Sequence, residues 1–326
     1  MIRVLIVMFT LLAAFGASAM PGRPLPFTPD PAKQLRVIIS SDAKNEADDD
    51  FAVAHALLTP TFAIRGLIAA HYTRTAAMLG NHQPTEPESY GELQRLLKVM
   101  GADAPLFHGA QRPLDARTPG LSEGARAIIT EAERDDARPL FVLVLGPATD
   151  VAQALIARPA IAGKLTVVWI GGNPYPAGGW EYNLYNDPRA ADALMRSKAA
   201  IWQVPHNVYM SMRVSLAELA VKVRPQGAPG RYLWQQLIGF NQWASEHIKG
   251  VPWPKSEVWV LGDNPAVGLL LDDHEYRYQT RPAPVINADL SYGAGNPART
   301  LRVYEQIDPH FVLEDFFAKL ALAYGG

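Results

Sequence analysis

The sequence predicts an α/β fold in which an open, mostly parallel sheet is flanked by helices. Two observations predict it. Short apolar runs rich in β-branched residues alternate with stretches whose apolar residues recur at helical spacing, which is typical of parallel strands joined by helices. No long linker, repeat or low-complexity segment interrupts this alternation, and the chain is long enough to bury a large core. We therefore expect one domain.

The expected strands and helices follow in order along that domain. Residues 35–39 are apolar and β-branched enough to form a buried first strand. Further strands are expected at residues 63–70, 139–145, 164–170 and 199–204. Helical spacing predicts helices at residues 51–58, 90–100, 150–157, 187–195 and 311–323. In the last helix the side chains expected in the core are Phe316, Phe317, Leu320 and Leu322.

The N-terminal segment predicts export. Arg3 precedes an apolar run at residues 4–15, and Ala17-Ser18-Ala19 has the small residues of a signal-peptide cleavage site. The run is too short to span a bilayer, so no membrane anchor is expected. The chain is therefore divided into a signal peptide at 1–19, an extended lead-in at 20–34 and a single domain at 35–326. We expect a periplasmic or secreted protein.

Composition excludes several classes of site. The chain has 30 basic and 32 acidic residues, and loss of Arg3 with the signal peptide changes the net charge from −2 to −3. This balance gives no reason to expect nucleic acid as a partner. The chain has no cysteine, which excludes disulfides, thiolate metal sites and cysteine nucleophiles. An exported protein without disulfides is compatible with a bacterial periplasm.

Five carboxylates lie where the first strand crosses to the first helix, at Asp42, Glu46, Asp48, Asp49 and Asp50. In open α/β sheets ligands bind at this carboxyl edge of the strands. The turn has no glycine and would repel a phosphate, whereas oxygen ligands at this density suit Ca²⁺ or Mg²⁺. The alternative is helix capping, which accounts for one or two acids in a first turn but not also for Asp42 and Glu46.

The same stretch resembles the signature of the nucleoside hydrolase family, a strand followed by Asp-x-Asp-x-Gly-x-Asp-Asp and an Ala/Leu-rich helix. Asp48 and Asp49 match the closing pair. The earlier part fits in two registers. Without a gap, Asp42 falls on the first Asp of the motif and Lys44 on the second. With a loop two residues longer, Ser40 falls on the first Asp and Asp42 on the second. Because the family's second Asp binds calcium and a lysine cannot, we prefer the longer loop.

Later stretches match the same family in order. Residues 143–150 are similar to its Thr-Gly-Pro-Leu-Thr-Asn segment, and residues 259–267 to its His-Asp-Pro-x-Ala-Val segment. Residues 181–191 are a closer match to its Glu-Phe-Asn-x-x-x-Asp-Pro-x-Ala-Ala segment. Without the resemblance, Glu181 and Asn183 would be explained as solvated loop residues. The resemblance implies a Rossmann-like nucleoside hydrolase fold over most of the mature chain.

Two departures from the family bear on activity. A histidine that helps the base to leave in some members is replaced by Gly262, and an asparagine that touches ribose is replaced by Thr73. His71 stands two residues before Thr73 at a strand end, where it is either a sugar contact or a structural residue. Asp263 precedes Asn-Pro, so it is either a metal ligand or a plain helix cap.

The resemblance implies a calcium-dependent hydrolase of the N-glycosidic bond of nucleosides. Ca²⁺ would be held by three carboxylates and one main-chain carbonyl, those of Asp42, Asp49, Asp263 and Leu145. Asp42 would also be the general base that takes a proton from water. The residues that would hold ribose are Asp48, Glu181, Asn183 and His71.

The expected partner is a small nucleoside or glycoside. The candidates for an acid that protonates the leaving base are, by their nearness in sequence, Tyr72, His82, Trp180 and Tyr182. Two alternatives keep the fold and the metal, namely a hydrolase of another glycoside and a non-catalytic protein that binds a sugar or nucleoside. A homo-oligomer is compatible with the sequence.

Overall fold

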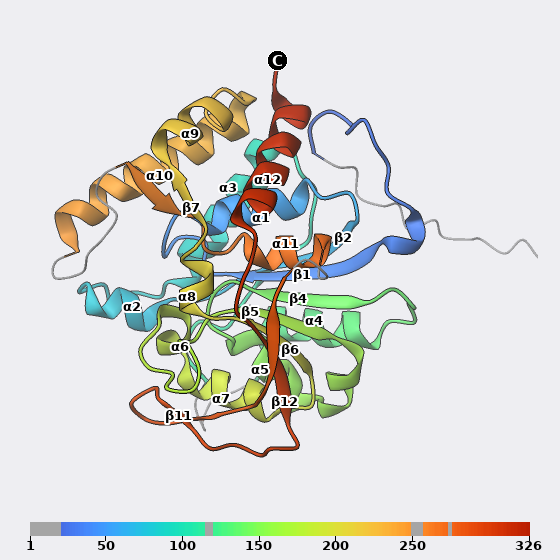
Figure 1. Cartoon of the computed structure of the whole chain (residues 1–326), viewed down its shortest axis with the longest axis vertical. Helices are drawn as coiled ribbons and strands as arrows, with labels where there is room; N and C mark the ends of the chain where they lie inside the picture. The colour runs from blue at the N-terminus through green and yellow to red at the C-terminus, as the bar shows by residue number, and fades with distance from the viewer. Residues whose placement is uncertain (1–20, 115–119, 249–256, 273–275) are drawn as a thin grey trace, which may run out of the picture.

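The computed structural model describes residues 21–114, 120–248, 257–272 and 276–326, so the predicted signal peptide lies outside the described residues. Its centre is an eight-stranded sheet (Figure 1). In spatial order the strands are β3 (Leu106–His108), β2 (Phe62–Ala69), β1 (Leu35–Ser41), β4 (Leu140–Val144), β5 (Thr166–Ile170), β6 (Ala200–Val204), β12 (Thr300–Tyr304) and β9 (Tyr278–Pro282). Within this sheet all neighbouring pairs are parallel except β12 and β9. The predicted α/β fold with a mostly parallel sheet is confirmed.

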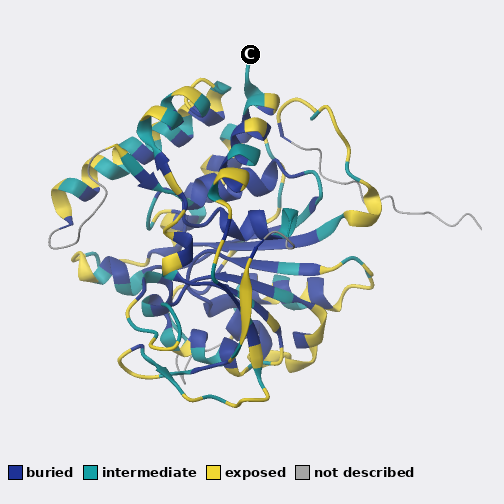
Figure 2. Cartoon of the chain, viewed as in Figure 1, coloured by how far each residue is buried: buried dark blue, intermediate teal, exposed yellow. Residues whose placement is uncertain are grey.

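Helices cover both faces of this sheet (Figure 2), and β1 shows why they must. Side chains alternate across a strand, so Val37 and Ile39 are buried on one face and Ile38 on the other. One layer contains α1 (Asp49–Leu57), α3 (Glu86–Met100), α10 (Gly227–His247), α11 (Pro265–Leu271) and α12 (Pro309–Tyr324). The opposite layer contains α4 (Glu123–Glu133), α5 (Thr149–Ala157) and α7 (Pro188–Arg196).

Short elements follow the carboxyl ends of the strands. The short helices are α2 (Thr73–Met78) after β2, α6 (Tyr182–Asn186) after β5, α8 (His206–Tyr209) after β6 and α9 (Leu216–Lys222). Two antiparallel pairs lie outside the main sheet, β7 (Arg213–Ser215) with β8 (Val258–Val260) and β10 (Val285–Ile286) with β11 (Tyr292–Gly293). The first pair continues at Leu261, whose N–H donates to the Met212 carbonyl at 2.9 Å, and so brings the end of β8 to the segment that follows α8.

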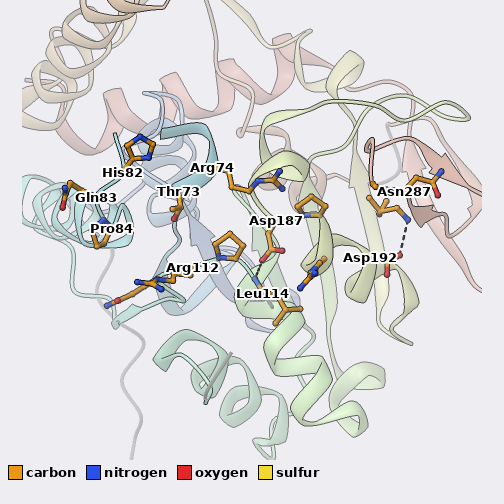
Figure 3. Close-up of a pocket in the computed structure, with 16 residues that line it drawn as sticks. Thr73, Arg74, His82, Gln83, Pro84, Arg112, Leu114, Asp187, Asp192 and Asn287 are labelled. Atoms are coloured by element: carbon orange, nitrogen blue, oxygen red, sulfur yellow. Dashed lines mark hydrogen bonds between the residues drawn. The ribbon is translucent and has the colours of Figure 1, made fainter. Parts of the chain in front are cut away.

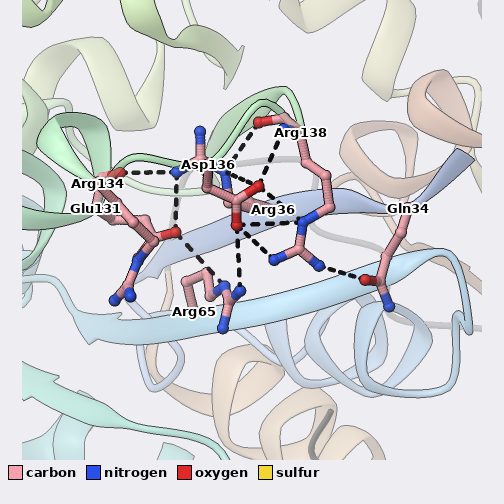
Figure 4. Close-up of polar contacts among 7 residues, drawn as sticks. All are labelled: Gln34, Arg36, Arg65, Glu131, Arg134, Asp136 and Arg138. Carbon is pink, nitrogen blue, oxygen red and sulfur yellow. Dashed lines mark hydrogen bonds and ion pairs between the residues drawn. The ribbon is translucent and has the colours of Figure 1, made fainter. Parts of the chain in front are cut away.

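A cluster of arginines and carboxylates lies at the amino ends of β1 and β2 (Figure 4). Buried Arg36 donates through Nη1 to the Glu131 carboxylate at 3.0 Å and through Nε to the Arg138 carbonyl at 2.9 Å. Hydrogen bonds from Arg138 hold the pKa of Asp136 below its usual range. Arg65 stands where the pairing of β1 with β2 shifts by one residue, and its Nε lies 3.5 Å from Glu131. These contacts fasten the edge of the sheet opposite the carboxyl ends of the strands.

Most predicted element positions are confirmed, and two details are wrong. Leu322 is 41% exposed on α12, although Phe316, Phe317 and Leu320 are buried as expected. The lead-in is not extended throughout, because residues Pro31–Lys33 form a single 3₁₀ turn capped by Asp30. Among the described helices, none is both long and apolar enough to cross a membrane.

Candidate active site

A cavity of about 360 Å³ lies where four neighbouring parallel strands end. The ends of β1, β4, β5 and β6 contribute Asp42, Leu145, Ile170 and His206. The wall is completed by Asn45, Glu46, Asp48, Asp49, Trp180, Glu181, Tyr182, Asn183, Tyr209, Met210, Trp259, Val260, Gly262 and Asp263. One wall is therefore acidic and the other is largely aromatic.

The acidic loop turns sharply between β1 and α1. The Asn45 N–H donates to the Asp42 carbonyl at 2.7 Å, and Asn45 Nδ2 donates to Asp42 Oδ2 at 3.1 Å. The Ser41 hydroxyl donates to Asp49 Oδ1 at 2.5 Å. A Cβ on Gly146 would lie 2.4 Å from Asp42 Oδ1, so only glycine leaves space for this carboxylate at the end of β4. The loop thus fixes two carboxylates in the floor of the cavity.

Three carboxylates come close enough to share one ion. Oxygen atoms of Asp48, Asp49 and Asp263 all lie within 4.8 Å of one another. The sequence assigned Asp42 rather than Asp48 to this group, and the structure places Asp42 in the same cavity but outside the close trio. Helix capping does not explain these acids, since Asp48 makes no side-chain cap bond and the N-cap position of α11 is held by Asn264, not by Asp263.

Burial and mutual repulsion raise the pKa of every carboxyl in this group. Burial raises the pKa of Asp49 to about 8, and the charge of Asp48 adds to the rise. Burial also raises the pKa of Asp48 to about 6, while backbone hydrogen bonds at Gly262 and Asp263 oppose the shift. The pKa values of Asp42 and Asp263 lie well above the usual range, first through burial and then through the charge of Asp49. These groups cannot all ionise unless a cation compensates them.

The donor set fits a hard divalent cation. No ion pair among the described residues involves Asp42, Asp48, Asp49 or Asp263, and Lys44 of the same loop pairs with Glu92 instead, at 3.1 Å. The available donors are carboxylate and carbonyl oxygens, which are the ligands that calcium and magnesium prefer. If a cation binds here, the residues in reach to hold it are Asp42, Asp48, Asp49, Asp263 and Leu145 through its carbonyl.

The Leu145 carbonyl already has one partner. Asn183 Nδ2 donates to it at 2.8 Å and to the Ile170 carbonyl at 2.9 Å. A carbonyl oxygen has two lone pairs, so one remains for a ligand in the cavity. Asn183 Oδ1 accepts no hydrogen bond from the described residues. The amide therefore joins the ends of β4 and β5 and leaves its oxygen free for a ligand.

Glu181 is more constrained than a solvated loop residue. It is 1% exposed and caps α6, accepting from the N–H groups of Asn183 at 3.2 Å and Leu184 at 3.0 Å. It also accepts from Gly172 N at 2.7 Å and from the Tyr209 hydroxyl at 2.9 Å. Glu181 and Asn183 are therefore not solvated loop residues, because the N-cap position and the first turn of α6 present them to the cavity.

The aromatic wall contains residues that the sequence reasoning missed. His206 and Tyr209 line the cavity from α8 and pack edge to face, with ring centroids 5.2 Å apart. His206 comes two residues after the end of β6, so the strand-end argument applied to His71 could have found it. Trp180 packs on Tyr182 at 4.6 Å between centroids, while Trp180 and Met210 remain 42% and 41% exposed. This wall offers flat apolar surfaces and one imidazole.

The substitution at Gly262 has a structural reason. A Cβ on Gly262 would lie 3.1 Å from Tyr209 Cδ2 and 3.3 Å from Asp48 Oδ2. Tyr209 therefore lies close beside Gly262, and a side chain at this position would require the Tyr209 ring to shift by a few tenths of an ångström.

The family profile of the inosine-uridine preferring nucleoside hydrolases matches residues 37–313. The chain belongs to this family. It is thus an N-glycosyl hydrolase of nucleosides.

The pyrimidine-specific ribonucleoside hydrolase RihA of Salmonella typhimurium is 24% identical, over 63% of this chain and 71% of the relative. The fold resembles a purine-preferring ribonucleoside hydrolase from Gardnerella vaginalis with a TM-score of 0.71, at 17% identity over 88% and 99% of the two chains. A plant nucleoside hydrolase, PpNRh1, gives a TM-score of 0.69 at 20% identity over 88% and 98%.

Several residues predicted for the site of this nucleoside hydrolase lie elsewhere. His71 is fully buried beside Thr149, with its Nε2 2.9 Å from the hydroxyl, and it does not line the cavity. The Tyr72 hydroxyl is bonded to Glu88. His82 and Thr73 line a second, separate cavity of about 820 Å³ (Figure 3). Only Trp180 and Tyr182 among the predicted leaving-group candidates lie at the acidic cavity.

Proposed function

We propose that this nucleoside hydrolase is a calcium-dependent enzyme that releases the free base from ribonucleosides. One observation carries the proposal: a group of buried and half-buried carboxylates faces an aromatic wall across a single cavity at the carboxyl edge of the sheet. The carboxylates suit a cation and the hydroxyls of a sugar, and the aromatic wall suits a planar base. A nucleoside has both parts, joined by the bond to be cleaved.

Asp42 is the proposed general base. Asn45 holds one of its oxygens, and the glycine at 146 leaves room for the other. Burial raises its pKa well above the usual range, which makes its ionised form a stronger proton acceptor. A bound Ca²⁺ would lower the pKa of a water in the cavity. Asp42 would accept a proton from the water whose oxygen attacks the anomeric carbon, while the bond from that carbon to the base breaks.

The sugar is proposed to lie between Asp48 and Asn183. Asp48 presents an ionisable carboxylate, and Asn183 presents an amide oxygen with no other partner among the described residues. Both can accept hydrogen bonds from ribose hydroxyls. Glu181 has four donors from the protein, so its role is to fix Asn183 and α6 as well as to face the sugar.

The base is proposed to stack against the aromatic wall near His206. Trp180 and Met210 are exposed at the cavity and can cover the faces of a flat ring. Burial lowers the pKa of His206, so its imidazole is neutral near pH 7 and can donate one N–H to a ring nitrogen or carbonyl of the leaving base. This aromatic surface favours a nucleoside over a glycoside with an aliphatic leaving group.

The test is a substrate panel. The mature protein, residues 20–326, is incubated with purine and pyrimidine ribonucleosides in 1 mM CaCl₂ or in excess EDTA, and free base and reducing sugar are measured. We expect release of both products in equal amounts in calcium and none in EDTA. Release that persists in EDTA would reject the metal dependence. Activity on aryl or alkyl O-ribosides but on no nucleoside would favour the glycoside alternative.

A further inference from the structure

Helix α1 carries site carboxylates at its first turn and a buried histidine near its last. His55 is fully buried and makes two side-chain contacts on opposite sides of its ring. Its Nε2 lies 2.7 Å from Asp315 Oδ2 on α12, and its Nδ1 lies 3.2 Å from Asn264 Nδ2 at the start of α11. The ring therefore connects three helices behind the cavity.

The direction of both hydrogen bonds follows from the partners. The Lys319 ammonium lies 2.5 Å from the same Asp315 oxygen and keeps that carboxylate ionised, so Asp315 can only accept. His55 must then carry its proton on Nε2, and its Nδ1 is left as an acceptor. Burial lowers the pKa of His55 to about 4, so the ring is neutral near pH 7. Asn264 consequently turns its NH₂ group toward His55.

Asn264 is the neighbour of Asp263, the member of the carboxylate trio that comes from the far end of the chain. It is fully buried and stands at the N-cap position of α11, which packs against α1. On the other side of Asp263, Gly262 lies beside Asp48, since a Cβ on Gly262 would lie 3.3 Å from Asp48 Oδ2. Helix α1 thus contacts the turn 262–264 at two points, through Asp48 before Asp263 and through His55 after it.

We propose that His55 and Asn264 are positioning residues that hold the turn 262–264 against α1, so that Asp263 joins Asp48 and Asp49 in one cation site. Asp315 acts indirectly, through His55, because its carboxylate selects the tautomer that lets His55 accept a hydrogen bond from Asn264. The inference rests on the proposed metal-dependent function. Removal of a residue that hydrogen-bonds a metal ligand commonly changes metal affinity by 10–100-fold, and we expect an effect of this size when the turn that carries Asp263 is released.

Two substitutions at the same position separate this role from simple packing. His55→Asn places an amide oxygen near the position of Nδ1 and can still accept from Asn264, but it does not reach Asp315. His55→Gln places its amide near Nε2 and can still reach Asp315, but it offers Asn264 no acceptor. Both remove the same ring, so both lose its packing against Phe316, whose centroid lies 5.4 Å away.

The measurement is a calcium titration by calorimetry on the metal-free mature protein, together with thermal unfolding in EDTA. We expect His55→Gln and Asn264→Ala to weaken calcium binding by about 10–100-fold and His55→Asn by less than about threefold. Ile128→Val is the control for stability alone, because Ile128 is fully buried on the opposite face of the sheet. It should lower the unfolding temperature and leave the calcium affinity unchanged.

Three results would overturn the inference. Equal calcium affinities for His55→Asn and His55→Gln would show that the hydrogen bond to Asn264 does not matter. A wild-type calcium affinity in Asn264→Ala would also show that this hydrogen bond does not matter. Asn264→Ala provides the test if the His55 variants do not fold. If the wild type binds no calcium, the metal dependence proposed above fails and this inference fails with it. If the wild type binds calcium and the variants bind it with the same affinity, this inference is rejected and the proposed metal dependence is not.

Discussion

The Tyr209 hydroxyl donates to the Glu181 carboxylate at 2.9 Å, across the wall of the cavity. Glu181 also caps α6, so this bond joins α8 to the helix that presents Asn183. We expect Tyr209→Phe to lower the free energy of unfolding by about 1.5–3 kcal/mol, the usual range for a hydrogen bond to a charged group. Because Asn183 would be held less firmly, KM for the nucleoside should rise more than kcat falls. An unchanged KM would contradict this role of the bond.

Asp42 and Asp48 have different proposed roles, which substitution to asparagine distinguishes. Asp42→Asn keeps one oxygen for a cation but cannot accept a proton from water, so kcat should fall by about 10²–10⁴-fold while nucleoside still binds. Asp48→Asn should raise KM as well as slow turnover, because its contacts to ribose form on binding. Steady-state kinetics on both variants decide the register of the acidic loop. Normal turnover in Asp42→Asn with loss in Asp48→Asn would make Asp48 the base.

The carboxylate group predicts opposite effects of pH with and without calcium. Because the folded-state pKa of Asp49 is raised to about 8, the metal-free folded protein binds more protons than the unfolded chain up to that pH. Its stability should therefore fall as the pH rises from 6.5 to 8.5. Calcium binds the ionised carboxylates, so its increase of the unfolding temperature should be larger at pH 8.5 than at pH 6.5. Thermal scans in EDTA and in CaCl₂ would test both, and an equal calcium effect at the two pH values would contradict the site.

His71 predicts a loss of stability in acid. Burial lowers its folded-state pKa to about 3, whereas an unfolded histidine titrates near 6.5, so the unfolded chain binds the extra proton between these values. Stability is full above pH 6.5 and falls as the pH decreases. His71→Gln can keep a contact to Thr149 without titrating. Relative to this variant, the wild type should lose about 2 kcal/mol between pH 6.5 and 4.5, measured by urea unfolding. A pH-independent difference would show that the pKa of His71 is the same in the folded and the unfolded state.

The N-terminal segment predicts export of the mature protein. We propose cleavage after Ala17-Ser18-Ala19, which gives an N-terminus at Met20. Mass spectrometry of periplasmic or culture-medium protein should find this terminus. Protein that retains Met1 and stays in the cytoplasm would refute the proposal.

The positions of the strands and the edge that holds the site could be predicted from the sequence. The apolar runs that end before Asp42 and at Leu145 specify strands, and parallel strands place their carboxyl ends at one edge of a sheet. The two stretches therefore had to meet. The family motifs then located Glu181, Asn183 and Asp263 in the same cavity, where the structure places them.

The partners of these side chains were decided by tertiary packing. Asp48 joins Asp49 and Asp263 because the β7–β8 pair brings the turn after β8 against α1, a contact between segments far apart in the chain. Likewise, Tyr209 lies close beside Gly262, and His71 turns toward Thr149 away from the cavity. Local spacing determines whether a stretch forms a strand or a helix and which of its faces is apolar. Which side chains meet across two elements depends on how those elements pack, and that is set by the core as a whole.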